Sequence, residues 1–434
     1  MEEIPVIQVY LWGSLVGAMS WDEERDYAYF QYDDHFRNSG LDIAPLMMPL
    51  AKTRGVVSFP SNAGAKCFCG LPGLIADALP DKFGSRLITE WFARQGKTEE
   101  MITPLDRLSY VGRRAMGALE FVPAAGVEGV NESTEIYIRE LVELSESIFR
   151  ERSRFQELLR QNDRSILDIL KVGTSAGGAK PKAIVAFNEA TGEVRSGQVP
   201  APEGFSYWLL KFDGGTYSEH NEISENPKGI GNIEYAYYKM ATACGITMSE
   251  CRLLPEGDSN HFMTRRFDRT PSGEKIHMQT AAGIAHLDRD VRHSYEELFG
   301  ILRRMGLNYK DFEQLYRRMV FNVVARNHDD HTKNFSFLMD KTGQWSFAPA
   351  YDVCYSYNPP GRWTRRHQLS LNGKTDDFTR EDLLAVAQGV GIRGAGRIID
   401  EILSSVASWP DTAKDCGVRP EFIEAVGKTL LLKI

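Results

Sequence analysis

The pattern of apolar and polar positions is most regular between residues 312 and 324. Apolar side chains recur there every three or four residues, at Phe312, Leu315, Tyr316, Met319, Val320, Val323 and Val324. This spacing places them on one side of an α-helix. We therefore expect a helix whose apolar side packs into a hydrophobic core.

The pattern changes directly after this helix. Residues 326–334 are polar, residues 335–339 and 344–347 are typical of strands, and residues 340–343 are typical of a turn. The sequence thus predicts a polar loop followed by an antiparallel hairpin. Asn334 stands just before the first strand and Asp352 a few residues after the second, so both should lie at the open end of the hairpin.

Other stretches predict a mixture of elements. We expect strands at residues 6–11, 27–32 and 207–212, helices at 74–79, 83–95, 134–159, 233–244, 295–305, 398–406 and 422–432, and a loop followed by a strand at 109–123. Asn232 is a typical N-cap for the helix that should begin at Ile233. The N-terminal part carries no catalytic group of residues, so we expect it to act as a scaffold or docking domain.

The composition is that of an ordinary globular protein, with 434 residues of which 42% are hydrophobic and 25% are charged. A chain of this length should form two or three subdomains. The net charge of −8 disfavours a strong affinity of its own for nucleic acid, because phosphate binding needs clustered Lys and Arg. The six cysteines are scattered and predict no disulfide framework. With no secretory leader and no long apolar run, we expect a cytoplasmic protein without a membrane contact.

The loop and hairpin carry the residues that phosphoryl transfer needs. Asp329 precedes Asn334 by five positions, which is the spacing between the base and a metal ligand in the catalytic loop of protein kinases. An amide oxygen from Asn334 and a carboxylate from Asp352 are hard oxygen ligands of the kind that Mg²⁺ prefers. Two alternatives remain: a transition-metal site at residues 328–331, and a polar loop that is merely solvated.

A stretch rich in small residues precedes a predicted strand at residues 173–187. Backbone N–H groups in such a loop, at Ser175, Ala176, Gly177 and Gly178, can approach phosphates closely. The stretch fails the P-loop pattern, because no Gly-Lys-Ser/Thr triplet closes it and a strand follows. It resembles the glycine-rich lid of a kinase, and a plain turn is the alternative.

A lysine interrupts the apolar strand at residues 207–212. Lys211 would be costly to bury without a partner, and Glu234, early in the next predicted helix, is a candidate for the ion pair that kinases place between a strand and a helix. The alternative is an edge-strand lysine that points to water. Residues 261–269, which include Arg265 and Phe267, are typical of a crossing between two lobes where backbone groups could bind adenine.

Four motifs together resemble the HipA family of bacterial toxin kinases: residues 177–182 (GGAKPK), 266–269 (RFDR), 327–336 (NHDDHTKNFS) and 349–352 (PAYD). The resemblance implies an α+β, two-lobed, protein-kinase-like fold with a small β-rich N-terminal subdomain and a mainly helical C-terminal lobe. It implies Asp329 as catalytic base, Asn334 and Asp352 as metal ligands, and an ATP site at Ser175, Ala176, Gly177, Gly178, Lys182, Lys211, Glu234, Arg265, Phe267, His331 and Lys333.

The resemblance also predicts domains at residues 1–127, 128–268 and 269–434, and a Ser/Thr protein kinase that uses ATP and Mg²⁺. Ser175 corresponds to a serine that family members autophosphorylate to silence themselves. Known members modify an aminoacyl-tRNA synthetase, arrest growth, and bind a HipB-like helix-turn-helix antitoxin through which they reach DNA. Two other functions remain open: a small-molecule phosphotransferase, and a non-catalytic binding module that kept the fold.

Overall fold

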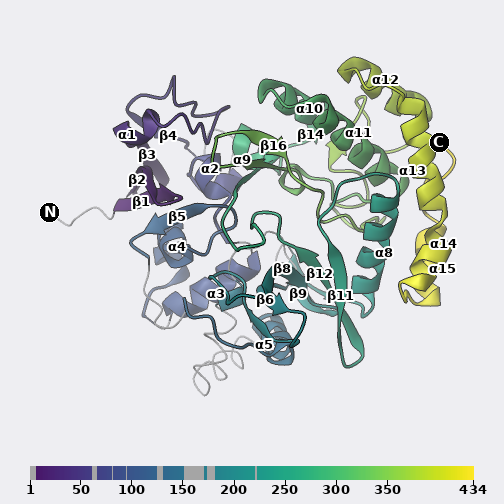
Figure 1. Cartoon of the computed structure of the whole chain (residues 1–434), viewed down its shortest axis with the longest axis horizontal. Coiled ribbons are helices and arrows are strands. Elements are labelled where there is room, and N and C mark those ends of the chain that lie inside the picture. Colours follow the sequence, from purple (N-terminus) through teal and green to yellow (C-terminus); the bar gives the residue numbers. More distant parts are fainter. Residues whose placement is uncertain are drawn as a thin grey trace.

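The computed structural model describes residues 6–60, 66–80, 82–93, 95–124, 131–150, 171–173, 181–219 and 222–434. Figure 1 shows the N-terminal sheet on one side, a second sheet below it, and a set of helices on the opposite side. Buried apolar side chains of the described residues gather in three hydrophobic cores, one in each of these regions.

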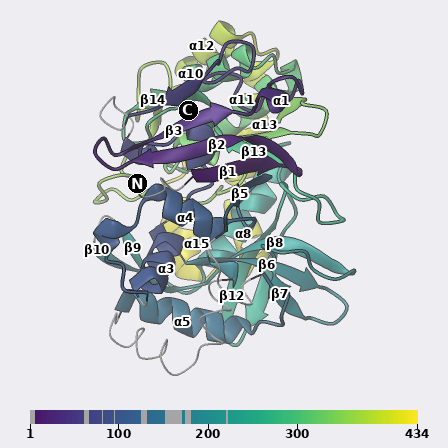
Figure 2. The same ribbon diagram turned by 90° about the vertical axis from the view of Figure 1, so that its left-hand side faces the viewer.

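The N-terminal region is built on a five-stranded antiparallel sheet in the order β4-β3-β2-β1-β5 (Figure 2). Side chains alternate along β1, where Ile7, Val9 and Leu11 point into the core, as expected for a half-buried strand. The elements are β1 Val6–Leu11, β2 Ser14–Asp22, β3 Tyr27–Tyr32, α1 Asp34–Arg37, β4 Val56–Ser58, η2 Lys66–Phe68, α2 Gly73–Ala76, α3 Lys82–Ala93, η3 Glu99–Met101, α4 Pro104–Val111 and β5 Leu119–Val122.

The second sheet is also antiparallel and has the order β11-β12-β8-β6-β7. Its core includes Trp208 and Leu210 of β8 and is shared with α3, α4 and α5. Helix α8 lies between the β9–β10 hairpin and β11 in the chain and contacts β11 and β12. The elements are α5 Ile138–Arg150, β6 Lys182–Asn188, β7 Val194–Ser196, β8 Phe205–Lys211, β9 Gly215–Glu219, β10 Glu222–Asn226, α8 Ile230–Ala243, β11 Cys251–Glu256 and β12 Ser259–Arg265.

The remaining region is mainly helical and is organised around α11, whose buried residues include Leu315, Met319 and Val323. This confirms the helix expected from the apolar spacing. The predicted hairpin is also confirmed as β15 and β16. The elements are β13 His277–Thr280, α9 Ala281–Ala285, β14 His293–Ser294, α10 Tyr295–Arg304, α11 Tyr309–Val324, η4 Thr332–Asn334, β15 Ser336–Met339, β16 Trp345–Phe347, β17 Leu369–Ser370, α12 Arg380–Val390, α13 Ala395–Ala407, α14 Trp409–Asp415 and α15 Pro420–Gly427.

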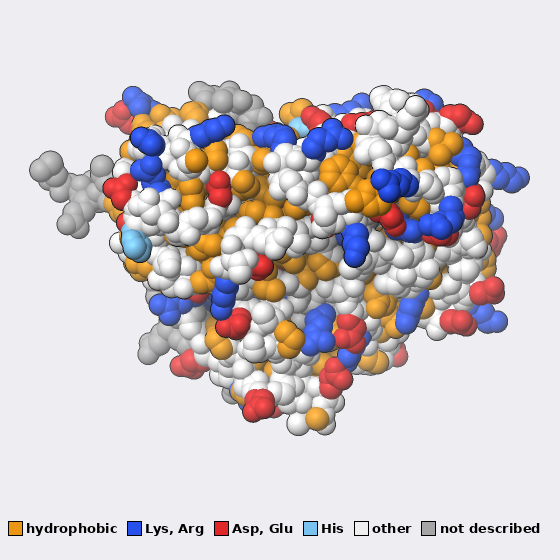
Figure 3. All heavy atoms as spheres, turned by 45° about the horizontal axis from the view of Figure 1, so that its top comes forward, with side chains coloured by type: hydrophobic (Ala, Val, Ile, Leu, Met, Phe, Trp, Pro, Cys, Tyr) orange, Lys and Arg blue, Asp and Glu red, His pale blue; other side chains and the backbone are white. Residues whose placement is uncertain are grey.

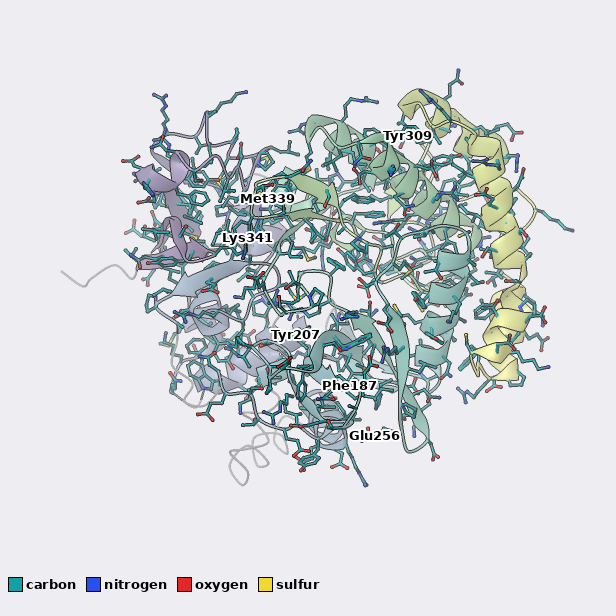
Figure 4. All side chains as sticks on the ribbon, in the orientation of Figure 1. Phe187, Tyr207, Glu256, Tyr309, Met339 and Lys341 are labelled. Atoms are coloured by element: carbon teal, nitrogen blue, oxygen red, sulfur yellow. The ribbon has the colours of Figure 1, made fainter. Side chains whose placement is uncertain are left out.

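The β15–β16 hairpin connects this region to the N-terminal sheet. Met339 belongs to the N-terminal hydrophobic core, and the indole of Trp345 donates to the carbonyl of Asp42 at 3.1 Å. Figure 4 shows Met339 and Lys341 on the side of the hairpin that is next to the N-terminal region. The turn of the hairpin is therefore anchored, which leaves its open end to face the second sheet.

The prediction that Asn232 caps the helix at Ile233 is wrong. Helix α8 begins at Ile230 after Gly229, whose φ of 92° suits a glycine, and Asn232 is buried within the first turn. The amide of Asn232 donates to the carbonyl of Cys416 at 2.8 Å, so this residue joins two helical segments. Glu234 consequently lies one turn further into the helix than expected.

Several other boundaries differ from the prediction, including the start of the helix expected at residues 134–159, which is α5 and begins at Ile138. Residues 109–111 are the end of α4, because Thr103 and Asp106 form a capping box and start a helix before them. The helix expected at 74–79 is the short α2, and the one expected at 422–432 ends at Gly427, after which Leu431 donates its N–H to the carbonyl of Val324 at 2.9 Å.

The architecture is an α+β, two-lobed, kinase-like fold, as expected. The predicted domain boundaries at 127/128 and 268/269 stay a prediction. None of the described helices has the length and apolar character needed to cross a membrane.

Candidate active site

The polar loop at residues 326–334 leads from the buried helix α11 to the hairpin. Helix α11 ends at Ala325, and Arg326 takes the left-handed backbone conformation, with φ of 56°, that turns the chain. Asn334 closes the loop by donating its side-chain N–H to the carbonyl of Asp329 at 2.7 Å. The hydrogen bond uses the amide nitrogen of Asn334 and leaves its amide oxygen available as a ligand.

Asp352 follows the second strand of the hairpin and also has a left-handed backbone, with φ of 52°. Its neighbour Tyr351 donates a hydroxyl hydrogen bond to the carbonyl of Lys333 at 2.5 Å. Since that hydroxyl has one proton, Ser336 is the donor in the 2.5 Å contact between its hydroxyl and that of Tyr351. These bonds hold Asp352 and Asn334 close together, and both line one pocket with Asp329.

Lys211 enters the same site from the end of β8. Its ammonium lies 2.5 Å from Oε1 of Glu234 on α8 and also contacts the carboxylate of Asp352. Burial alone lowers the pKa of Lys211, but the two carboxylates outweigh it and raise that pKa above its ordinary value. Conversely, Lys211 and Lys182 hold the pKa of Asp352 well below its ordinary range although burial opposes them. Both ions are therefore charged at neutral pH.

Asp329 differs from these paired groups because its side chain is 51% exposed. The ring of His331 lies 3.7 Å from its carboxylate. The backbone is fixed instead: the N–H of Asp329 donates to the hydroxyl of Ser356 at 2.9 Å, and that hydroxyl donates to Asn327 at 3.1 Å. Asp329 thus presents a carboxylate that an incoming hydroxyl can reach.

Asp330 and His328 point into the protein. The carboxylate of Asp330 accepts hydrogen bonds from the hydroxyl of Tyr295 at 2.8 Å and from the N–H of Gln368 at 2.7 Å, and it pairs with His367 at 2.9 Å. Burial lowers the pKa of His328 to about 3, so its ring is neutral. The described residues contain no group of three or more His, Cys, Asp or Glu side chains that could hold a metal.

Some predicted nucleotide-site residues lie near this pocket. Lys182 is buried on β6, opposite Lys211 in the sheet register, and the ring of Phe267 lies 5.6 Å from that of Tyr351. Arg265 forms a partly exposed ion pair with Glu250 at 3.5 Å.

The charge of Lys333 acts on Cys67, Cys69 and Asp77 of the N-terminal region, and Lys333 is not among the residues that line the pocket. The predictions for Ser175, Ala176, Gly177 and Gly178 fall outside the described residues.

The side chains of Asn334 and Asp352 fit a hard divalent cation such as Mg²⁺. Both present oxygen, the ligand atom that this cation prefers, and the charge of Asp352 is maintained by Lys211. Two protein ligands also leave room for phosphate oxygens and water, which is typical of magnesium sites that act on nucleotides.

Sequence patterns did not reveal the residues that support the site. Ser356 and Asn327 fix the backbone of Asp329, and Tyr351 joins the two arms of the hairpin. Tyr351 is part of the PAYD motif, but its hydrogen bond to the carbonyl of Lys333 requires the folded β15–β16 hairpin. Ser356 lay in a segment without any recognisable spacing.

The fold and the site together define a two-lobed protein of the kinase-like class. Residues 7–122 match the sequence model of the HipA N-terminal domain, and residues 174–410 match that of the HipA-like C-terminal domain. The chain belongs to the HipA family.

Three known proteins are similar to this chain. A chain of the Shewanella oneidensis MR-1 complex of HipA, HipB and operator DNA has a TM-score of 0.67 at 16% identity, with 98% of this chain and 96% of that chain covered. At that identity the likeness shows the fold alone. A Sinorhizobium fredii protein named "Putative kinase Y4dM" is 26% identical over 169 residues, which is 36% of this chain and 39% of the relative. A Haemophilus influenzae protein named "Putative kinase" is 26% identical over 138 residues, 28% of this chain and 40% of the relative. The match thus spans about two fifths of each curated relative.

Proposed function

We propose that this protein is an ATP- and Mg²⁺-dependent serine/threonine protein kinase of the HipA type. The observation that carries the proposal is the convergence of Asp329, Asn334 and Asp352 on one pocket, next to the Lys211–Glu234 ion pair. These residues come from four separate parts of the chain. A carboxylate base, two oxygen ligands and a paired lysine are the groups that kinases use.

The roles of the side chains follow from their environments. Asp329 is exposed and fixed by its backbone, so it can orient a substrate hydroxyl and accept its proton. Lys211 is held by Glu234 and supplies a fixed positive charge toward the transferring phosphoryl group. Asn334 and Asp352 would hold the cation. Bound ATP supplies the phosphoryl group, and Mg²⁺ neutralises the charge of its phosphates.

The partners belong to the same proposal. The Shewanella relative forms a complex with HipB and operator DNA, and we extend a HipB-like helix-turn-helix antitoxin to this chain. The antitoxin would supply the affinity for DNA that a chain of net charge −8 lacks. The protein substrate, for which an aminoacyl-tRNA synthetase is a candidate, would be phosphorylated to arrest growth.

The direct test is transfer from labelled ATP in a bacterial lysate. The wild-type protein with Mg²⁺ should label a small number of proteins, and the Asp329→Asn variant should label them at least about a hundredfold more slowly. Label in a small molecule rather than a protein would favour a small-molecule phosphotransferase. No ATP-dependent transfer to any acceptor would contradict the kinase function.

Autophosphorylation of Ser175 is a separate prediction. Incubation with ATP and Mg²⁺ should add one phosphate to the wild-type protein, as intact-mass measurement would show, and should lower its activity on other substrates. The Ser175→Ala variant should gain no mass and stay active for longer. A Ser175→Ala variant that still gains the phosphate would show that the modified residue is another one.

A further inference from the structure

The segment that follows Asp352 begins and ends on the 326–334 loop. At its start, the hydroxyl of Ser356 accepts the N–H of Asp329 at 2.9 Å. At its end, the carboxylate of Asp330 pairs with His367 at 2.9 Å and accepts the N–H of Gln368 at 2.7 Å. Because Asp329 and Asp330 are adjacent, the residues between these anchors, 357–366, form a loop that leaves and returns beside the proposed base.

Hydrogen bonds within this 357–366 loop keep it folded. The N–H of Asn358 donates to the carbonyl of Thr364 at 3.2 Å, and that of Gly361 donates to Asn358 at 2.9 Å. The side chain of Gln368 donates to the carbonyl of Trp363 at 2.8 Å. The loop is thus a closed structure of defined shape next to the exposed carboxylate of Asp329.

The outer side of the loop is basic. Arg362, Arg365 and Arg366 are exposed, and residues 353–375 contain no Asp or Glu. Arg292 is also exposed and adjoins the loop, because the next residue, His293, pairs with Leu369 in a two-stranded sheet. We call Arg292, Arg362, Arg365 and Arg366 the arginine face. Figure 3 shows Lys and Arg side chains, together with some Asp and Glu side chains, along the upper edge of the face that it draws.

The arginine face has no neutralising partner. In the described part of the chain, no carboxylate oxygen forms an ion pair with any of its four guanidinium groups. Of the acidic residues that flank these segments, Asp376 pairs with Arg326 at 3.5 Å and Asp290 pairs with Arg289 at 3.7 Å, whereas Asp377 is exposed. The arginine face is therefore a local positive surface on a chain of net charge −8, and it is accessible to a ligand.

We propose that the arginine face binds acidic residues that flank the acceptor Ser or Thr of a protein substrate, an inference that rests on the kinase function proposed above. A polypeptide whose hydroxyl reaches Asp329 would lie beside the 357–366 loop, which is anchored on Asp329 itself and on the adjacent Asp330. Guanidinium groups pair well with carboxylates in such positions. A long nucleic acid fits less well, since it would extend beyond four arginines onto an acidic protein.

Peptide binding tests the surface without catalysis. Fluorescent peptides with one serine flanked by Glu, Gln or Lys are titrated with the full-length protein, and a single-stranded RNA is titrated alongside. We expect the Glu peptide to bind roughly tenfold more tightly than the Gln peptide, the scale of two or three exposed ion pairs. The Arg365→Glu/Arg366→Glu variant should lose this preference and favour the Lys peptide. The matched control is Lys414→Glu/Lys433→Glu, which makes the same charge change on two exposed residues of the C-terminal segment and should keep the preference.

The outcomes separate the surface from the catalytic function. Equal binding of the three peptides, or tighter binding of RNA that the Arg365→Glu/Arg366→Glu variant abolishes, would overturn the inference. Added ATP and Mg²⁺ then test transfer to the bound peptide. A Glu peptide that binds selectively but accepts no phosphate would contradict the proposed kinase while leaving the acidic-peptide surface established.

Discussion

At the scale of single residues, the site separates groups that are held from groups that are free to react. Lys211 pairs with both Glu234 and Asp352, so the positions and charges of these three side chains are fixed before any ligand binds. Asp329 is held through its backbone, by Ser356 and Asn334. A base needs this combination, because its carboxylate must be well placed and yet free to accept a proton.

The contrast predicts that Asp329 contributes to activity and not to stability. Replacing it by Asn removes the base and should lower kcat for phosphoryl transfer by roughly 10²- to 10⁴-fold. The melting temperature should remain that of the wild type, since the side chain is 51% exposed and forms no close ion pair among the described residues. Steady-state kinetics and a thermal melt on the same preparation check both parts. A variant with normal kcat would remove Asp329 from the mechanism.

At the scale of elements, α8 determines where Glu234 lies. Gly229 and Gly231, at its start, donate their N–H groups to the buried carboxylate of Asp213 at 2.9 and 3.1 Å. This carboxylate satisfies helix donors that would otherwise have no partner, and its charge favours the helix N-terminus. Asp213 lies two residues after Lys211, the last residue of β8, and so connects the strand of Lys211 to the helix of Glu234.

We therefore expect Asp213→Ala to weaken both the fold and the site. Loss of the buried acceptor should cost about 1–3 kcal/mol of unfolding free energy in a urea titration. The KM for ATP should rise, because α8 would no longer hold Glu234 against Lys211. Asp213→Asn is the control, since its amide oxygen can still accept one of these hydrogen bonds and should restore part of both quantities. An Ala variant with unchanged stability would show that α8 is fixed by its packing alone.

The sequence predicted some elements correctly and others wrongly, and the difference depends on whether the signal is local. The apolar spacing of α11 and the turn residues of the β15–β16 hairpin are local signals, and both elements were predicted correctly. The start of α8 was wrong because its capping group, Asp213, lies outside the local pattern of the helix. Asn232 looked like a cap but is used in a contact with Cys416, far along the chain. Contacts between residues far apart in the chain leave no recognisable spacing of residues in the sequence.

The same limit applies to the site. Asp329 and Asn334 could be predicted from their spacing, and Asp352 from its position after the hairpin. The residues that hold them, such as Ser356 and Tyr351, act through hydrogen bonds to the backbone of distant segments. Because almost any polar residue type can make such a bond, the sequence alone does not distinguish them.

At the scale of the whole molecule, a buried cluster joins the N-terminal region to the second sheet. Asp268 forms ion pairs with Arg266 at 2.6 Å and Arg269 at 2.8 Å, and it accepts the N–H of Gly117 from the N-terminal region at 2.7 Å. Arg266 in turn donates to the carbonyl of Gly197 beside β7 at 2.9 Å. The RFDR motif, which suggested only a crossing between lobes, thus also connects the N-terminal region to the second sheet.

This cluster makes the stability of the whole protein depend on pH in a defined direction. Burial on its own raises the pKa of Asp268, but Arg266 and Arg269 hold that pKa well below its ordinary value. A carboxyl with a lowered pKa in the folded state stabilises the fold above its unfolded pKa of about 3.9. That contribution is lost as the pH falls below this value toward the folded pKa. The wild-type protein should therefore lose unfolding free energy on acidification, in part through Asp268.

Asp268→Asn tests this dependence because it keeps the shape of the side chain and removes its charge. Two buried guanidinium groups then lack their carboxylate, so the unfolding free energy at neutral pH should fall by roughly 3–5 kcal/mol in a urea titration. Below about pH 4 the variant should lose less than the wild type, since the titrating group is gone. Asp258→Asn, at an exposed turn, is the control that should follow the wild-type curve. Parallel curves for wild type and Asp268→Asn would mean that other carboxylates govern acid unfolding. A steeper loss in wild type would show that one buried charge holds the N-terminal region against the lobes that carry the site.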